Sequence, residues 1–229
     1  MSSAFEWLLP SNAVVVEAAP SMWNADLAAD EERCIRYATS KRRREFTAGR
    51  TCARAALHRL GISNHSIPVD HINAPIFPKG ISGTITHTAS YCAAAVIRKI
   101  ETAAIGIDAE VNDQIPREMR HLIVASDEEN AIFRDSENAP FDPIKIAFSA
   151  KEAFYKAFYQ QAEQFLEWRD VLISLQLELS TFSIRMLKRD VPSYFHQRTF
   201  LGRFCVDDRR VYTAIALPME TRNRMAGSI

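Results

Sequence analysis

The sequence has no excess of charge of either sign, because 28 Lys and Arg residues balance 28 Asp and Glu residues. A chain without net charge has no overall electrostatic field that would attract it to nucleic acid or to an acidic membrane, although zero net charge does not exclude a local basic patch. We therefore expect no nucleic-acid partner.

Long apolar runs are also missing. None approaches the roughly 20 apolar residues that cross a bilayer, and the N-terminal stretch MSSAFEWLLP lacks the basic start and long apolar core of a signal peptide. The expectation is a cytoplasmic protein without a transmembrane segment.

Cysteine is scarce, and no pair has the C-x-x-C spacing of a zinc site. The four cysteines are Cys34, Cys52, Cys92 and Cys205. We expect them to be reduced and mostly buried thiols.

A hydrophobic content of 47% over 229 residues is enough for a sizeable core, and the length allows one large domain or two small ones.

The string IGIDAE carries the first chemical signal. Ile105 and Ile107 alternate with Gly106, Asp108 and Glu110, which is typical of a half-buried strand with both acids on one face. Residues two apart on a strand are roughly 6.5 to 7 Å apart, a gap that one hard cation with a carboxylate ligand on each side can span. Gly106 would let a ligand approach the backbone. The alternative is a solvated strand face that ends in a turn.

The string FSAKEAFYKAFY predicts a helix that starts with a capping box of Ser149 and Glu152. Glu152 and Lys156 share one face, while Phe154 and Phe158 form an apolar pair on another. Alternatively, Glu152 only caps the helix and pairs with Lys156. The combination of three acids and a lysine favours a magnesium site with a cation left for phosphate oxygens.

A weak internal repeat divides the chain. GTITHTASYCAAAVI at Gly83–Ile97 and GRFCVDDRRVYTAIAL at Gly202–Leu217 each read as strand, polar turn and strand, with a tyrosine opening the second strand. The repeat indicates two similar halves, with coincidence as the alternative.

Other expected elements are a helix over Asp30–Gly61, strands over Thr84–His87, Tyr91–Arg98 and Ile105–Glu110, and a helix opened by Ser126 with Glu129 at its capping-box position.

Four strings together resemble the 4'-phosphopantetheinyl transferase superfamily. Its signature pairs a G-[IV]-D-x-E strand with an F-[ST]-x-K-E-x-x-[YF]-K helix, and both are here. APIFPKGISGTITH at Ala74–His87 and KRRREFTAGRTCARAAL at Lys41–Leu57 resemble the branch that includes enterobactin synthase component D. The strings occur in the family's order from about Arg36 to Tyr159.

The resemblance implies a fold and an activity. The fold would be a monomeric α/β (α+β) chain with a pseudo-twofold pair of similar halves. The N-terminal half, residues 1–104, would carry the basic helix and the ITH strand, and residues 105–229 the metal-binding strand and catalytic helix. The activity would be Mg²⁺-dependent transfer of 4'-phosphopantetheine from coenzyme A to a serine of an apo carrier protein, leaving adenosine 3',5'-bisphosphate.

The resemblance also implies roles for the acids and the lysine. Asp108, Glu110 and Glu152 match the family's magnesium ligands, and Asp108 and Lys156 would also face coenzyme A. Glu152 is the best candidate for the base that takes the serine proton, directly or through a bound water. Lys156 would neutralise phosphate charge.

Contacts to coenzyme A are expected from the N-terminal half. By resemblance His87 contacts a phosphate of coenzyme A, with Thr86 beside it. The basic stretch that begins at Arg36 suits the 3'-phosphate, and within it Arg36 and Arg50 fit the family positions best.

The acceptor cannot be read from the sequence. Peptide-synthetase, polyketide and fatty-acid carrier domains all present a similar helix start, and the resemblance to siderophore-pathway enzymes favours a siderophore carrier without excluding the others. We expect docking near the junction of the halves, where Phe148, Phe154 or Tyr155 would be exposed, with a place in the core as the alternative for aromatic residues at helical spacing. Rival functions are a non-catalytic coenzyme A or carrier-protein binding module and a magnesium phosphohydrolase that uses water.

Overall fold

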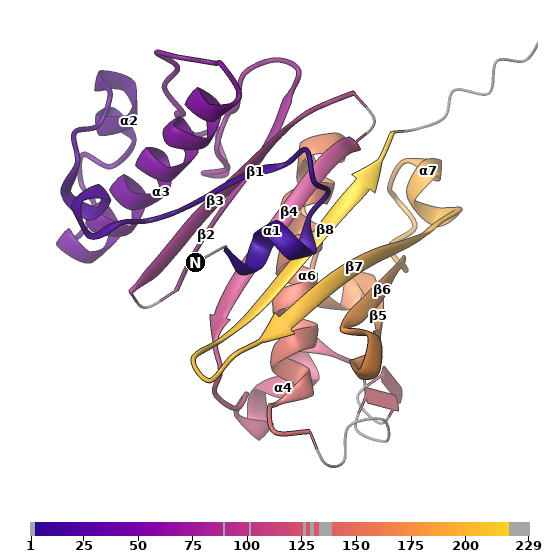
Figure 1. Cartoon of the computed structure of the whole chain (residues 1–229). Coiled ribbons are helices and arrows are strands. Elements are labelled where there is room, and N and C mark those ends of the chain that lie inside the picture. The colour runs from indigo at the N-terminus through magenta and orange to yellow at the C-terminus, as the bar shows by residue number, and fades with distance from the viewer. Residues whose placement is uncertain are drawn as a thin grey trace, which may run out of the picture.

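The computed structural model describes residues 3–88, 90–100, 102–125, 127–128, 131–132 and 139–219, and these form two antiparallel sheets with helices packed on them (Figure 1). The first sheet has the order β1 (Val14–Glu17), β3 (Tyr91–Arg98), β2 (Ile81–Thr88). The second has the order β4 (Thr102–Val111), β8 (Arg210–Pro218), β7 (Thr199–Val206), β6 (Thr181–Met186), β5 (Val171–Gln176).

Two long helices, α3 (Ser40–Arg59) and α6 (Pro143–Ala162), pack on the sheets. The shorter helices are α1 (Ala4–Leu8), α2 (Ala29–Cys34), α4 (Arg117–Ile123) and α7 (Ser193–His196), with 3₁₀ turns η1 (Pro20–Asn24), η2 (Trp168–Asp170) and η3 (Leu177–Leu179). No helix within the described residues has the length and apolar character needed to cross a membrane. All four cysteines are free thiols, two of them buried.

The internal repeat is confirmed by the topology. The two repeated stretches form the β2–β3 and β7–β8 hairpins, and β1–β3–β2 with α3 corresponds to β4–β8–β7 with α6. The tyrosines that open β3 and follow the start of β8, Tyr91 and Tyr212, pack edge to face with ring centroids 5.6 Å apart. The fold is therefore the expected α+β pair of similar halves, the second extended by β5 and β6. The boundary that we propose between residues 104 and 105 falls inside β4.

The halves meet where β2 runs beside β4. The hydroxyls of Ser82, Thr84 and Thr86 accept hydrogen bonds from backbone N–H groups of β4 at 2.8, 3.3 and 3.0 Å. Because strand side chains alternate, residues two apart on β2 all face β4. Side-chain oxygens thus accept hydrogen bonds from the backbone N–H groups along the edge of β4 that has no neighbouring strand in the described topology.

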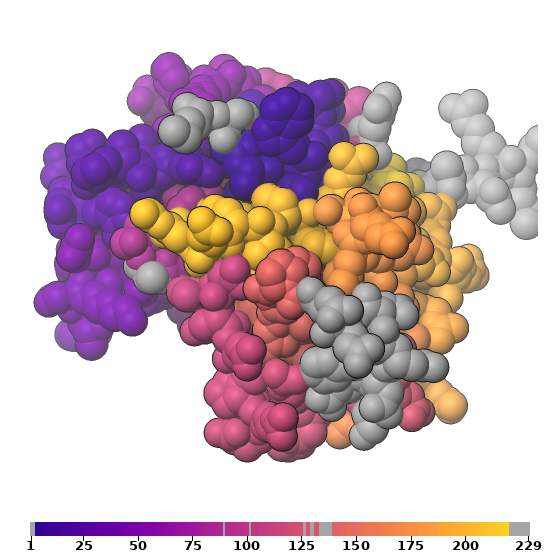
Figure 2. All heavy atoms as spheres, turned by 60° about the horizontal axis from the view of Figure 1, so that its bottom comes forward, coloured from indigo at the N-terminus to yellow at the C-terminus, as the bar shows by residue number. Residues whose placement is uncertain are grey.

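The N-terminal helix also bridges the halves. Helix α1 packs on β7 and β8, and the ring of Phe5 meets that of Tyr212 at 5.5 Å. Figure 2 shows the indigo N-terminal residues against the yellow C-terminal strand.

The predicted start of the catalytic helix is wrong. Helix α6 begins at Pro143, with Asp142 as its cap accepting from Ile144 N at 2.9 Å, so Ser149 lies in the helix interior. A proline in the first turn after an Asp is itself a start signal, and it outweighs the capping-box pattern.

The single helix expected over Asp30–Gly61 is also wrong. This stretch forms two helices, α2 and α3, and Thr39 caps the second through Arg42 N. The strands expected at Thr84–His87, Tyr91–Arg98 and Ile105–Glu110 are confirmed. Ser126 and Glu129 lie outside the described residues.

Strand β4 is buried on both faces, whereas the sequence predicted a half-buried strand. Ile105 and Ile107 pack into a cluster with the N-terminal half, while the opposite face lies against α6. A Cβ atom at Gly106 would overlap the carbonyl oxygen of Ala153. Gly106 therefore admits the α6 backbone and not a ligand, and this packing brings the acids of β4 to α6.

Candidate active site

Asp108 is the most heavily bonded carboxylate of the site and is 5% exposed. Its Oδ1 accepts from Lys156 Nζ at 2.7 Å and from Thr86 Oγ1 at 3.2 Å, and its Oδ2 accepts from Ser149 Oγ at 2.8 Å. A carboxylate has about four acceptor positions. These three donors leave one acceptor position for a ligand.

Lys156 bridges helix and strand. Besides Asp108, its ammonium donates to the carbonyl oxygen of Ile107 at 3.0 Å. Lys156 forms its ion pair with Asp108, and not with Glu152 as the alternative interpretation of the helix expected. An ammonium has three N–H donors, so one remains for a phosphate oxygen.

Glu152 lies one helical turn before Lys156 and accepts a hydrogen bond from Trp168 Nε1 at 2.7 Å. Burial raises the pKa of Glu152, and the charge of Asp108 raises it further, while the indole N–H and Lys156 lower it. The predicted capping role of Glu152 is wrong, because α6 begins well before it.

Glu110 follows Asp108 on the same face of β4. Burial, with the charges of Asp108 and Glu152 adding to it, raises the pKa of Glu110 to about 7, and Lys145 and Lys156 oppose the rise. The acids are therefore close enough to repel one another, and a bound cation would relieve that repulsion. Among the described residues, however, no group of three or more His, Cys, Asp or Glu side chains is gathered in a ready-made metal cluster.

His87 lies at the end of β2, where Arg42 of α3 reaches it. Arg42 Nη1 is 3.1 Å from His87 Nε2, and a carboxylate oxygen of Glu45 is 4.0 Å from Nδ1. Burial lowers the pKa of His87, as do the charges of Arg42 and Lys156, although Glu45 opposes them. The imidazole is thus mainly neutral at neutral pH. The neighbouring Thr86 hydroxyl faces the other way, toward β4.

The two arginines selected from the sequence lie in different environments. Arg36 is exposed beside the ring of Tyr37, in the connection between α2 and α3. Arg50 is buried, with its Nε donating to Ile67 O at 2.7 Å and its guanidinium over the ring of Phe46, and burial lowers its pKa to about 10. The arginine beside His87 is Arg42, which the spacing alone did not single out.

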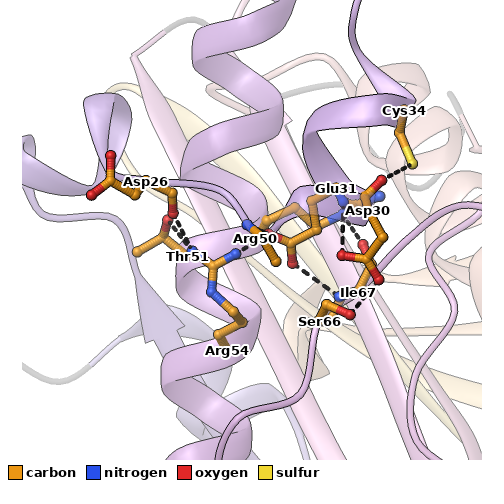
Figure 3. Close-up of polar contacts among 10 residues, drawn as sticks. Asp26, Asp30, Glu31, Cys34, Arg50, Thr51, Arg54, Ser66 and Ile67 are labelled. Atoms are coloured by element: carbon orange, nitrogen blue, oxygen red, sulfur yellow. Dashed lines mark hydrogen bonds and ion pairs between the residues drawn. The ribbon is translucent and has the colours of Figure 1, made fainter.

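Arg50 borders a buried polar cluster that fixes α3 (Figure 3). Glu31, fully buried on α2, accepts from Arg54 of α3 and from Ile67 N at 2.9 Å. Beside it, Ser66 donates to Asp30 at 2.5 Å. The cluster therefore ties α2, α3 and the segment around residue 67 together and sets the position of the basic helix.

A cavity of about 1310 Å³ opens between the halves next to Glu152 and Lys156. Its walls are residues 70–77, the start of β2, the exposed side of α6 and residues 163–169. Tyr159 donates to Asp70 at 2.6 Å and so connects two of these walls. The volume exceeds the roughly 300 to 1,000 Å³ of common ligand pockets, which suits a long substrate.

The aromatic residues considered for docking belong to the core. Phe154 is fully buried and stacks near Phe158 at 6.0 Å, as expected for the apolar pair. Phe148 and Tyr155 pack partly buried against the same core. The expectation that Phe154 is exposed is therefore wrong.

Comparison with known proteins gives concordant matches in both halves. Residues 30–97 match the model of the 4'-phosphopantetheinyl transferase N-terminal domain, and residues 104–214 match that of the 4'-phosphopantetheinyl transferase superfamily.

Curated relatives are similar over most of the chain. The 4'-phosphopantetheinyl transferase Svp of Streptomyces mobaraensis is 33% identical over 218 residues, which cover 92% of this chain and 87% of that protein. The 4'-phosphopantetheinyl transferase Npt of Nocardia iowensis is 32% identical, with 81% and 87% covered. Enterobactin synthase component D of Salmonella typhi is 31% identical, with 72% and 71% covered.

Proposed function

The chain belongs to the 4'-phosphopantetheinyl transferase superfamily, and we propose the following mechanism and acceptor group for it. As a 4'-phosphopantetheinyl transferase it uses coenzyme A and acts on apo carrier proteins. We propose that the reaction is Mg²⁺-dependent and modifies a serine, leaving adenosine 3',5'-bisphosphate. We also propose, from the sequence, a cytoplasmic monomer.

One observation carries the proposed chemistry. Lys156 and Glu152, one turn apart on α6, face the acidic end of β4, where Lys156 bonds to Asp108. Acids and an ammonium in one place are what phosphoryl transfer requires, since its catalysis depends on positioning and on stabilising charge.

The donor set fits magnesium. Asp108 retains an acceptor position, and burial raises the pKa values of Glu110 and Glu152, so a bound cation would stabilise the charged forms of these carboxyls. Hard oxygen ligands of this kind are the ones that magnesium prefers. Asp108, Glu110 and Glu152 would hold the ion, which when bound would neutralise charge on the pyrophosphate oxygens of coenzyme A.

The protein's own groups would handle the proton and the phosphate charge. The serine oxygen forms a bond to the β-phosphorus as the bond from that phosphorus to the bridging oxygen breaks, so the hydroxyl proton must leave. Glu152 would accept it, directly or through a water, because burial favours its protonated form. The unused N–H of Lys156 would bind a phosphate oxygen.

Coenzyme A would lie across the junction of the halves. Its phosphates would meet His87 and Thr86 at the end of β2, although the Thr86 hydroxyl is already bonded to β4. The 3'-phosphate would be bound from the basic helix by Arg42, which lies beside His87, with Arg36 and Arg50 as the sequence-derived candidates. The cavity beside Glu152 would take the pantetheine arm.

The proposal is tested by the intact mass of an apo carrier protein incubated with this chain, coenzyme A and Mg²⁺. We expect a gain of one phosphopantetheine that EDTA prevents. No gain with peptide-synthetase, polyketide and fatty-acid carriers would support a binding module. Cleavage of coenzyme A without any carrier would support a phosphohydrolase. The set of carrier proteins that become modified would also show whether the enzyme acts in siderophore, other nonribosomal peptide or fatty acid biosynthesis.

A further inference from the structure

Trp168 contacts the proposed base through a single strong interaction. Its indole Nε1 donates to Oε1 of Glu152 at 2.7 Å, a charge-assisted hydrogen bond. Within the described residues this is the only hydrogen bond of the Glu152 carboxylate, and it leaves Oε2 without a donor. The indole ring packs edge to face on Phe148 with centroids 5.5 Å apart.

The backbone of Trp168 is itself anchored, by the residue that precedes Glu152 on α6. Lys151 is fully buried and donates to the carbonyl oxygens of Trp168 and Ile123, each at 2.8 Å, and of Val171 at 3.2 Å. Its charge is paired with Glu128 at 3.1 Å. A buried ammonium with this many partners fixes the segment after residue 167 against α6.

We propose that Trp168 is a positioning residue that orients Glu152 for metal binding and proton transfer. The indole N–H fixes Oε1 and leaves Oε2 to bind a cation together with Asp108, whose charge already interacts with that of Glu152. A free glutamate side chain has several rotamers, and the hydrogen bond removes that freedom before substrate binds. The inference rests on the proposed function, because it takes Glu152 as a ligand and base.

The decisive variant is Trp168→Phe, which keeps an aromatic ring against Phe148 but removes the N–H. Loss of an outer-shell partner of a metal ligand typically weakens metal binding or activity about 10- to 100-fold. We expect the dissociation constant for Mn²⁺, measured by electron paramagnetic resonance on the substrate-free protein, to rise about 10-fold. We expect kcat to fall by a similar factor and KM for coenzyme A to change by only about twofold, since phenylalanine keeps an aromatic ring at position 168 of the cavity wall and the nucleotide contacts remain.

Two control variants separate positioning from packing. Trp7→Phe makes the same exchange at an exposed residue of α1 and should leave Mn²⁺ binding and kcat unchanged. Phe148→Leu loosens the ring packing of Trp168 but keeps the N–H, so its effect on Mn²⁺ binding should be small. If Phe148→Leu weakens Mn²⁺ binding as much as Trp168→Phe does, or if Trp168→Phe leaves it unchanged, the positioning role is overturned.

A double variant identifies the residue through which Trp168 acts. In a Glu152→Ala background, Trp168→Phe should cause no further loss of Mn²⁺ affinity, because the partner is gone. Full additivity would overturn the inference while leaving the metal assignment intact. Unchanged Mn²⁺ binding by Glu152→Ala alone would instead overturn the assignment of Glu152 as a ligand, and the inference with it.

Discussion

Lys156 and Asp108 are 48 residues apart in sequence, yet the ammonium of Lys156 lies 2.7 Å from Oδ1 of Asp108. The contact joins the C-terminal half of α6 to the C-terminal half of β4. It keeps the charge of a buried aspartate balanced and places the lysine where a phosphate would approach the acids. The ion pair is thus a structural bond between two elements of the C-terminal half and a preformed part of the proposed site.

Replacing the lysine should disable transfer. Lys156→Met keeps much of the side-chain volume but removes the charge, and loss of one preorganised donor to a transition-state oxyanion costs about 10²- to 10³-fold in kcat. Carrier-protein mass after timed incubations measures the rate. Lys188→Met, which removes a half-exposed lysine paired with Asp170, is the control. Wild-type kcat in Lys156→Met would contradict the proposed role.

Metal affinity should rise with pH. The pKa of Glu110 is raised to about 7 in the metal-free protein, so below that pH a cation must displace a proton from the carboxyl. Affinity for Mn²⁺ should therefore increase about 10-fold between pH 6 and pH 8 and then level off. Titrations followed by electron paramagnetic resonance at several pH values measure this. Glu110→Gln should bind more weakly and with a flatter pH dependence, and an equal slope in this variant would count against Glu110.

Lys151 should be essential for stability. Lys151→Met leaves Glu128 buried without its counter-ion and several carbonyl oxygens without a donor, so we expect a loss of about 3 to 5 kcal/mol in the free energy of unfolding. Urea denaturation followed by circular dichroism checks this. The matched change Lys188→Met affects a half-exposed pair and should cost at most about 1 kcal/mol. Similar costs for both variants would argue against the Lys151 anchor.

The hydroxyls of β2 should stabilise the junction of the halves. Thr84→Val preserves the shape of the side chain but leaves the buried N–H of Ile107 without its acceptor, which should cost about 1 to 3 kcal/mol. Thr199→Val, on an exposed position of β7, should change stability by less than about 0.5 kcal/mol. Amide hydrogen exchange adds a local test, since Ile107 N–H should lose protection in Thr84→Val but not in the control.

Several features followed from the sequence because they depend on neighbouring residues. Alternating apolar residues located the strands, and the repeat predicted the two hairpins, with Tyr91 and Tyr212 near the start of their second strands. The helical spacing predicted the Phe154–Phe158 pair. The motif strings indicated the family, which the matches in both halves confirm. The assignment of individual site residues stays a prediction.

Other features depended on segments that meet only after folding. The alternating pattern of β4 is typical of one buried face, but α6 covers the second, because Gly106 allows its backbone to approach. No local pattern could show that Lys156 pairs with Asp108 and not with Glu152, or that Trp168 reaches Glu152. Likewise, the orientation of α3 selects Arg42 over Arg36 as the neighbour of His87.

The sequence by itself therefore determined the periodic elements, the internal symmetry and the chemical groups available for phosphoryl transfer. The tertiary structure decided which of those groups are partners. The physical reason is that a strand or helix pattern records only which side of an element is apolar, whereas a hydrogen bond or ion pair needs two atoms within about 3 Å. That proximity is set by how distant segments pack.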